Sequence, residues 1–206
     1  MPELDISDPA EPSTDRLLEM VRACEDAARS VTGVTNSEGA EAAWGRSRVA
    51  LATTTGFAQA YARSGASLGV SVLGGEGTAM EGDYEMTSAC HLADLRDAAE
   101  VGRLAGERTV ARLNPRRIKT ARLPVIMEPR IARGLLGTLT GAINGSSVAR
   151  GTSFLKDSLD ERLFAPGITV VDDPFRRRGP RSRPFDGEGL AGRRREIISD
   201  GILTSW

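Results

Sequence analysis

The stretch Ser67-Leu-Gly-Val-Ser-Val-Leu73 alternates between apolar and small or polar residues, which predicts a half-buried β-strand. Outward from it, a period of two extends from Ala40 to about Met86. Thr53-Thr-Thr-Gly56 and Gly74-Gly-Glu-Gly77 interrupt this pattern and have the composition of turns. The pattern therefore predicts an antiparallel meander.

Helical periodicity flanks the predicted sheet. Ser13, Thr14 or Asp15 is expected to cap a first helix that runs to about Ser30, with an apolar side and with Cys24 on the core face. The segment 32–38 has turn chemistry, and a second helix is predicted from His91 to about Leu113. The expected apolar side of the first helix comprises Leu17, Leu18, Val21 and Ala28.

In the second half of the chain, the sequence pattern predicts shorter helices and strands. A strand is expected over 122–127, a third helix over 129–144 beginning at Pro129, and a buried strand over 168–171. Asp200-Gly201 lies between apolar runs and predicts a hairpin within 195–206. Because the chain stops in the returning strand, we expect the natural protein to continue.

Four glycines recur on one face of the third predicted helix, at positions 134, 137, 141 and 145. Each glycine costs about 1 kcal/mol of helix stability relative to alanine, so a compensating interaction is expected. One interpretation is tight packing of this face on a sheet. The other is a ligand or partner that presses against it.

Composition excludes several classes of protein. Of the 206 residues 40% are hydrophobic, which suffices for a core, and no apolar run approaches the roughly 20 residues of a membrane span. The acidic start, MPELDISDPAEPSTD, is unlike a secretory signal, and two cysteines are too few for a disulfide framework. These features predict a cytoplasmic protein without membrane association.

Charge is distributed unevenly along the chain. Residues 1–110 carry 18 acidic and 9 basic side chains, whereas residues 111–206 carry 10 and 18. The arginines at 176–178, 181, 183 and 193–195 have the charge needed for phosphate contacts, but acidic residues are interleaved with them. A solvated or interface-forming face is favoured over nucleic-acid binding.

The usual catalytic and metal-binding patterns are absent from the sequence. A hydrolytic zinc site needs about three protein ligands, and this chain has one histidine, no H-E-x-x-H and no C-x-x-C. Cys90 and His91 are adjacent, so their side chains diverge and make a poor nucleophile–base pair. Both cysteines are interpreted as packing residues.

Several motifs nevertheless resemble a known family. They are Arg150-Gly-Thr-Ser-Phe-Leu155, Phe164-Ala-Pro-Gly-Ile-Thr-Val-Val-Asp-Asp-Pro174, Arg183-Pro-Phe-Asp-Gly-Glu-Gly189 and 193–206, with Gly33–Gly39 and Gly75–Met80 upstream. They are similar to the TldD/PmbA family, once called modulators of DNA gyrase, and to its PmbA (TldE) branch.

The resemblance implies a fold and a truncated chain. The expected class is α+β: an antiparallel sheet with flanking helices, from the late part of an N-terminal α/β domain, joined to the start of a β-rich C-terminal domain. The implied division is 1–118 and 119–206. Family members are longer, so this chain is expected to be an internal fragment that lacks both ends.

The resemblance also implies a role. TldD-type members carry H-E-x-x-x-H, and the corresponding positions are Leu136, Gly137 and Gly141. The expected protein is thus a metal-free, non-catalytic subunit that pairs with a zinc-bearing TldD-type subunit in a protease acting on unfolded peptides. The candidate peptide or partner groove comprises Asn144, Ser146, Ser147, Gly151, Thr152, Ser153, Asp186 and Glu188.

Alternatives remain open at this stage. Asn144, Ser146 and Ser147 also fit an ordinary turn at a helix end. An interaction module for DNA gyrase or nucleic acid would predict steeply salt-dependent DNA binding through 176–195. An independent hydrolase would require Cys90 or His91 for its activity.

Overall fold

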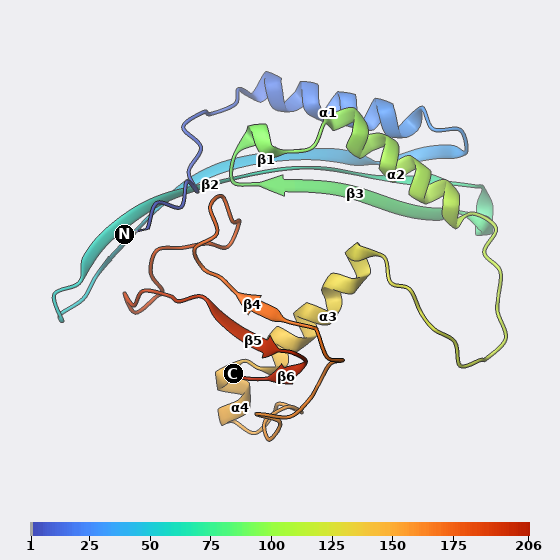
Figure 1. Cartoon of the computed structure of the whole chain (residues 1–206). Coiled ribbons are helices and arrows are strands. Elements are labelled where there is room, and N and C mark those ends of the chain that lie inside the picture. Colours follow the sequence, from blue (N-terminus) through green and yellow to red (C-terminus); the bar gives the residue numbers. More distant parts are fainter. Residues whose placement is uncertain (1) are drawn as a thin grey trace. The chain divides into compact units, whose positions relative to one another are not determined.

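The computed structural model describes residues 2–206. The contacts between residues divide the chain into two compact units. Each unit is built from two segments that are separate in the sequence. The first unit contains the chain up to Arg117 together with Pro174–Gly192, and the second contains Ile118–Asp173 and Arg193–Trp206 (Figure 1). The mixture of helices and antiparallel sheets confirms the predicted α+β class. The division into domains 1–118 and 119–206 stays a prediction.

The first unit is built on a three-stranded antiparallel sheet. Its strands are β1 (Val34–Ala52), β2 (Ala58–Gly74) and β3 (Glu81–Ala89), in the order β1-β2-β3. Ala42 pairs with Leu68 and Leu68 with Thr87, which confirms the predicted meander. A turn joins β1 to β2, where the Thr53 N–H donates to the Phe57 carbonyl at 2.8 Å and Gly56 has a φ of +91°.

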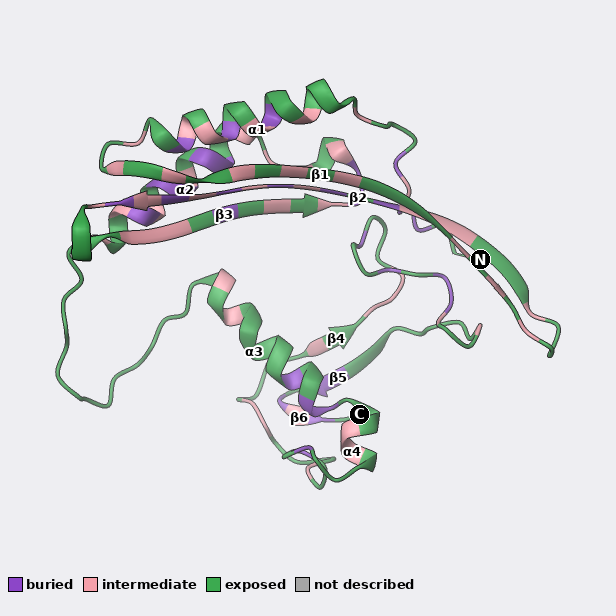
Figure 2. Cartoon of the chain, turned by 180° about the vertical axis from the view of Figure 1, so that it is seen from behind, coloured by how far each residue is buried: buried purple, intermediate pink, exposed green. Residues whose placement is uncertain are grey.

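Two helices cover one face of this sheet, α1 (Thr14–Arg29) and α2 (Ala98–Arg112) (Figures 1 and 2). Ser13 caps α1 as predicted, because its hydroxyl accepts the Arg16 N–H at 3.2 Å. Asp97 caps α2 through the Glu100 N–H. The buried side chains between helices and sheet are Met20, Cys24, Ala28, Leu68, Val70, Val72, Val101 and Ala105.

Close approach of α1 and α2 depends on two glycines. A Cβ added at Gly102 would overlap the carbonyl oxygen of Cys24, and one at Gly106 would lie 2.8 Å from the Ala28 oxygen. At both positions the added Cβ would be closer to a backbone atom of α1 than van der Waals contact allows. The two backbones therefore pack directly on each other at Gly102 and Gly106.

The structure corrects three expectations in this unit. Segment 32–38 is not all turn, because β1 begins at Val34. Its turn-forming residues lie within the strand, where the pairing with β2 shifts register between Val34 and Asn36 and between Ser37 and Gly39. The predicted helix 91–113 starts later, because Asp97 caps α2 and only the short helix η2 (Leu92–Asp94) precedes it. Leu18 is exposed rather than packed. A second short helix, η1, spans Gly77–Ala79.

The second unit contains α3 (Pro129–Ala142), α4 (Gly145–Ala149) and a sheet of β4 (Val170–Asp172), β5 (Arg195–Ser199) and β6 (Ile202–Leu203). The predicted hairpin is confirmed: Asp200 and Gly201 both have positive φ, at +46° and +82°, between β5 and β6. The core of this unit comprises Leu139, Ala142, Ile143, Leu155, Ile197, Ile198 and Leu203.

Two strand predictions are wrong in the second unit. No strand forms over 122–127, where Ile126 is 98% exposed, because no neighbouring strand completes its hydrogen bonds. The predicted buried strand 168–171 forms only over Val170–Asp172, and Ile168 and Val171 are exposed. In both places the apolar pattern predicts more strand than the structure forms. Among residues 2–206, no helix is long and apolar enough to cross a membrane.

Candidate peptide-binding surface

Within the second unit, the glycine face of helix α3 is open. Glu128 and Pro129 begin the helix, and Leu139 and Ala142 bury its opposite side in the core of the second unit. A Cβ added at Gly134, Gly137 or Gly141 meets nothing within 4 Å among the described residues. The same holds for Gly145, but α3 ends at Ala142 rather than at the predicted 144, so Gly145 begins α4 instead. The expected tight packing of these glycines on a sheet is therefore wrong. The alternative, a ligand or partner against this face, stays a prediction.

The glycine face contains two of the three positions that the resemblance assigns to a zinc motif, Gly137 and Gly141, and Leu136 is on a neighbouring side of the same helix. Leu136 is exposed, and neither it nor Gly137 or Gly141 has a nitrogen, oxygen or sulfur atom in its side chain. Across residues 2–206, no group of three or more histidine, cysteine, aspartate or glutamate side chains has the placement of a metal site. The side chains at positions 136, 137 and 141 therefore do not fit a hydrolytic zinc ion, which needs about three protein ligands.

The polar candidates around α4 make mostly local hydrogen bonds. Asn144 caps α4, because its side-chain oxygen accepts the Ser146 N–H at 3.1 Å and the Ser146 hydroxyl at 2.8 Å. The Ser147 carbonyl accepts from the Thr152 N–H and hydroxyl at 3.0 and 3.2 Å. Gly151 has a φ of +70°, which suits the turn after a helix. A peptide-binding role for these residues stays a prediction.

Ser153 has a structural role that a mutation can test. Its buried hydroxyl donates to the Ala142 carbonyl at 2.6 Å and accepts the Leu155 N–H at 3.0 Å. Ser153→Ala removes both bonds, so we expect a loss of about 1–3 kcal/mol in the free energy of unfolding of the second unit. Denaturant unfolding followed by Trp206 fluorescence, in a Trp44→Phe background, measures it. Exposed Ser146→Ala is the matched control, and equal effects would contradict the assignment.

Asp186 and Glu188 belong to the other unit. The Asp186 carboxylate accepts the N–H groups of Leu190 and Glu188, each at 2.9 Å, and so closes its own loop. These N–H groups, Leu190 first, lower the pKa of Asp186. Glu188 is exposed. The structure thus assigns Asp186 a local role, and groove binding by either residue stays a prediction.

A polar cluster that the sequence analysis missed joins the chain's start to its Arg-rich segment in the first unit. The buried His91 ring lies 3.2 Å from an Asp5 carboxylate oxygen and 3.8 Å from one of Asp8. Arg178 contacts Asp5 at 2.7 Å and Asp94 at 3.0 Å. The Arg178 guanidinium is the first cause of the lowered pKa of Asp5. The unique histidine was the available sequence signal, but nothing in the sequence indicated its partners.

Several arginines of the basic segment are engaged by carboxylates. Arg177 and Arg178 contact Asp5, whereas Arg195 and Arg194 lie 3.3 and 4.0 Å from Asp172 and Asp173. These pairs are interactions within this chain. They leave fewer free cations for phosphate contacts than the sequence alone suggests.

Both cysteines are buried and free, as their interpretation as packing residues predicts. Burial is the main cause that raises the pKa of Cys24 to about 11, and burial also raises the pKa of Cys90. Thiolates are therefore disfavoured at both positions near neutral pH. His91 faces Asp5 and Asp8, so Cys90 and His91 do not form a nucleophile–base pair.

Comparison with known proteins agrees with this arrangement. Residues 7–113 match the PmbA/TldA metallopeptidase central domain, and residues 120–206 match the PmbA/TldA metallopeptidase C-terminal domain. Metalloprotease PmbA of Escherichia coli O157:H7 is 38% identical over the whole chain, which covers 46% of that protein. A homolog from Haemophilus influenzae is 32% identical with the same coverage. The chain thus spans about half the length of these relatives.

Solved structures have the same fold. A protein of Bacteroides thetaiotaomicron that carries the name modulator of DNA gyrase aligns over 100% of this chain and 48% of its own, at 25% identity and a TM-score of 0.88. TldE from Thermococcus kodakarensis aligns over 100% and 46%, at 19% identity and a TM-score of 0.75. With both domain models matched in sequence order, this chain belongs to the PmbA/TldD metallopeptidase family.

Proposed function

We propose that the protein is the metal-free, non-catalytic subunit of a cytoplasmic zinc metalloprotease, which pairs with a zinc-bearing TldD-type subunit and acts on unfolded peptides. The observation that carries the proposal is the open face of α3. At the three positions of the zinc motif, α3 has a leucine and two glycines, whose side chains supply no metal-donor atom.

The remaining chemistry of the chain supports this role over an independent hydrolase. The one histidine is engaged by Asp5 and Asp8, and burial disfavours both thiolates. A hydrolase acting alone would need an activated nucleophile or a bound metal ion with open coordination. Among residues 2–206 both thiols are buried, and no group of histidine, cysteine, aspartate or glutamate side chains has the placement of a metal site.

The open glycine face gives the proposed pairing a physical basis. Glycine costs helix stability, so three of them on one exposed face of α3 suit a close approach of another backbone. Exposed Leu135, Leu136 and Ile131 lie on the same helix and would supply apolar contact. The partner subunit or an extended peptide is the proposed occupant.

The alternative of a gyrase-modulating or nucleic-acid-binding module rests on the names of relatives and on the arginine cluster. It is less favoured because Arg177, Arg178 and Arg195 contact carboxylates within the chain. DNA binding whose affinity falls steeply with salt, and which is lost on replacing Arg176, Arg181 and Arg183, would favour it instead.

The decisive experiment measures bound zinc and hydrolysis of an unfolded peptide by the full chain alone, by its H-E-x-x-x-H-bearing relative alone, and by the mixture. We expect zinc and cleavage to require the relative, and cleavage to appear in the mixture. A relative whose first motif histidine is replaced is the control and should abolish cleavage. Zinc-dependent cleavage by this chain alone would overturn the proposal.

A further inference from the structure

The hairpin formed by β1 and β2 extends beyond the rest of its sheet as a two-stranded arm. β3 pairs only with residues 66–74 of β2, so residues 45–65 form a part of the hairpin that has no third strand of the sheet beside it. This arm carries Arg46, Arg48 and Arg63 and no acidic residue. By contrast, the other residues up to 110 carry 18 acidic and only 6 basic side chains. The arm is therefore a local basic site on an acidic part of the chain.

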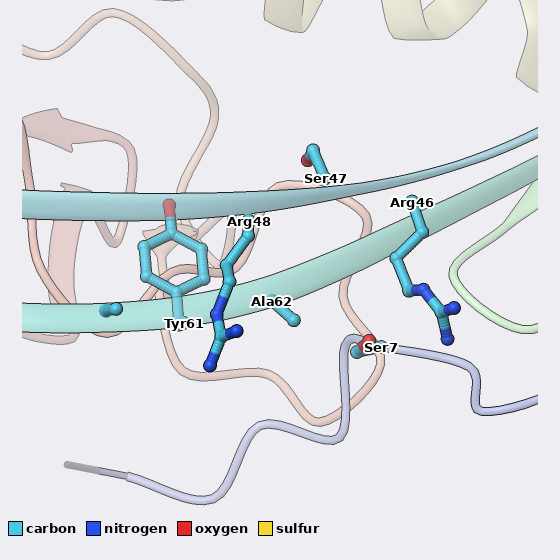
Figure 3. Close-up of a pocket in the computed structure, with 7 residues that line it drawn as sticks. Ser7, Arg46, Ser47, Arg48, Tyr61 and Ala62 are labelled. Atoms are coloured by element: carbon cyan, nitrogen blue, oxygen red, sulfur yellow. The ribbon is translucent and has the colours of Figure 1, made fainter.

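The two faces of the arm differ in what covers them. On one face, Phe185 makes edge contacts with Phe57 and Tyr61, at ring-centroid distances of 5.0 and 5.2 Å. On the other face, Arg46 and Arg48 extend to the same side of β1, the side on which Ser7 lies, whereas Ser47 points away (Figure 3). The small side chain of Ala62 lies directly opposite Arg48 in the register.

An open pocket of about 510 Å³ lies beside the two arginines, and its lining comprises Ser7, Arg46, Ser47, Arg48, Ala60, Tyr61 and Ala62. Within residues 2–206, Arg48 contacts no carboxylate. Arg46 has a loose partner, Glu11, at 3.6 Å, and its guanidinium lies 5.7 Å from the Trp44 ring centre. The indole N–H of Trp44 is buried and lacks an acceptor in the described chain. The row formed by Arg46 and Arg48 thus presents guanidinium donors whose carboxylate partners are distant or absent, whereas the buried Trp44 N–H is not accessible to a ligand.

We propose that this row binds an extended peptide segment with acidic residues at alternate positions. Side chains two apart on a strand point to the same face and lie about 7 Å apart, so carboxylates at alternate peptide positions match Arg46 and Arg48. β1 is an edge strand whose one sheet neighbour among the described residues is β2. Its outer backbone groups are therefore available to pair with the same peptide. This inference deepens the proposed peptide-handling function and rests on it.

The chain itself indicates why a short acidic segment fits better than a nucleic acid. Glu11 already places a carboxylate near Arg46, at a distance too long for a strong hydrogen bond. Three arginines on the arm are few for a polyanion, and the acidic remainder of residues 1–110 repels a long one. A nucleic-acid backbone also lacks the amide pattern that pairs with a strand edge.

The test uses a labelled ten-residue peptide of alternating threonine and glutamate, and fluorescence anisotropy on the full chain without its zinc-bearing relative. We expect Arg46→Gln with Arg48→Gln to raise the Kd about tenfold, the sum of two exposed ion pairs. Glu11→Gln should lower the Kd, because it removes the competing carboxylate. Arg22→Gln, at an exposed site on α1, is the matched control for lost charge and should leave the Kd unchanged.

Peptide controls separate the possible outcomes. A peptide of the same composition with its glutamates in one block, and one with glutamine for glutamate, should both bind more weakly. Equal binding of all three peptides, an unchanged Kd in the double variant, or preferential binding of a single-stranded DNA decamer would overturn the inference. Because the zinc-bearing relative is absent, these outcomes are independent of whether the two subunits form an active protease.

Discussion

A Gly102→Ala variant is expected to lose about 3 kcal/mol of the free energy of unfolding of the first unit. The added methyl group would overlap the Cys24 carbonyl oxygen, and backbone atoms cannot move aside as a flexible side chain can. Helices α1 and α2 must then separate, which loosens the core around Val101 and Ala105. Denaturant unfolding followed by Trp44 fluorescence, in a Trp206→Phe background, measures this loss.

The matched control applies the same substitution to the other glycine-bearing helix. Gly137→Ala places its methyl group in open space, so the second unit should gain about 0.5–1 kcal/mol from helix propensity. The opposite signs distinguish close packing from an open face. A destabilised Gly137→Ala chain would show that this face is already packed against something, and an unaffected Gly102→Ala chain would contradict the helix contact.

An Asp8→Ala variant is expected to lose about 3 kcal/mol through a different mechanism. The buried carboxylate accepts the Leu92 N–H at 2.8 Å and the Ala10 N–H at 2.9 Å, and it faces His91. Its removal leaves these donors without an acceptor, and charged hydrogen bonds contribute about 1.5–3 kcal/mol each. Exposed Asp26→Ala in α1 is the control and should change stability by less than about 0.5 kcal/mol.

The effect of Asp8 should also depend on pH in a defined direction. The Leu92 N–H, followed by the Ala10 N–H, lowers the pKa of Asp8 below its unfolded value of about 3.9. The stabilisation is therefore present above pH 4 and is lost as the pH falls through the folded-state pKa. Unfolding curves from pH 7 to pH 2 should show the natural chain and Asp8→Asn converging in acid. A stability difference that grows in acid would contradict this prediction.

Much of the local structure followed from the sequence because its causes are local. The alternation in 67–73 reflects one face against helices and one away from them, and Asp200-Gly201 supplies the positive φ angles of a tight hairpin. Ser13 could be predicted as a cap because its hydroxyl accepts a hydrogen bond from the N–H of Arg16, only three residues further along the chain. The residue types alone also show that positions 136, 137 and 141 carry no zinc ligands.

Other features depended on which segments meet in space. The apolar segment 122–127 had the composition of a strand but found no partner, and the glycines of α3 had helical spacing but no surface to pack on. Close packing instead occurs at Gly102 and Gly106, which did not stand out in the sequence. Spacing defines which residues share a face, whereas the packing of that face is set by long-range contacts.

The sequence by itself determined the meander, the capped start of α1 and the terminal hairpin, since these depend on residue type, period and short separations. Its motifs also carried the family resemblance, which implied the α+β class. Only the tertiary structure brought Asp5, Asp8 and His91 together with Arg178, and exposed the Arg46–Arg48 row on an arm free of acidic residues. These partners are more than 80 residues apart, so no periodic pattern in a single sequence indicates that they contact each other. Their contact depends on how the whole unit packs.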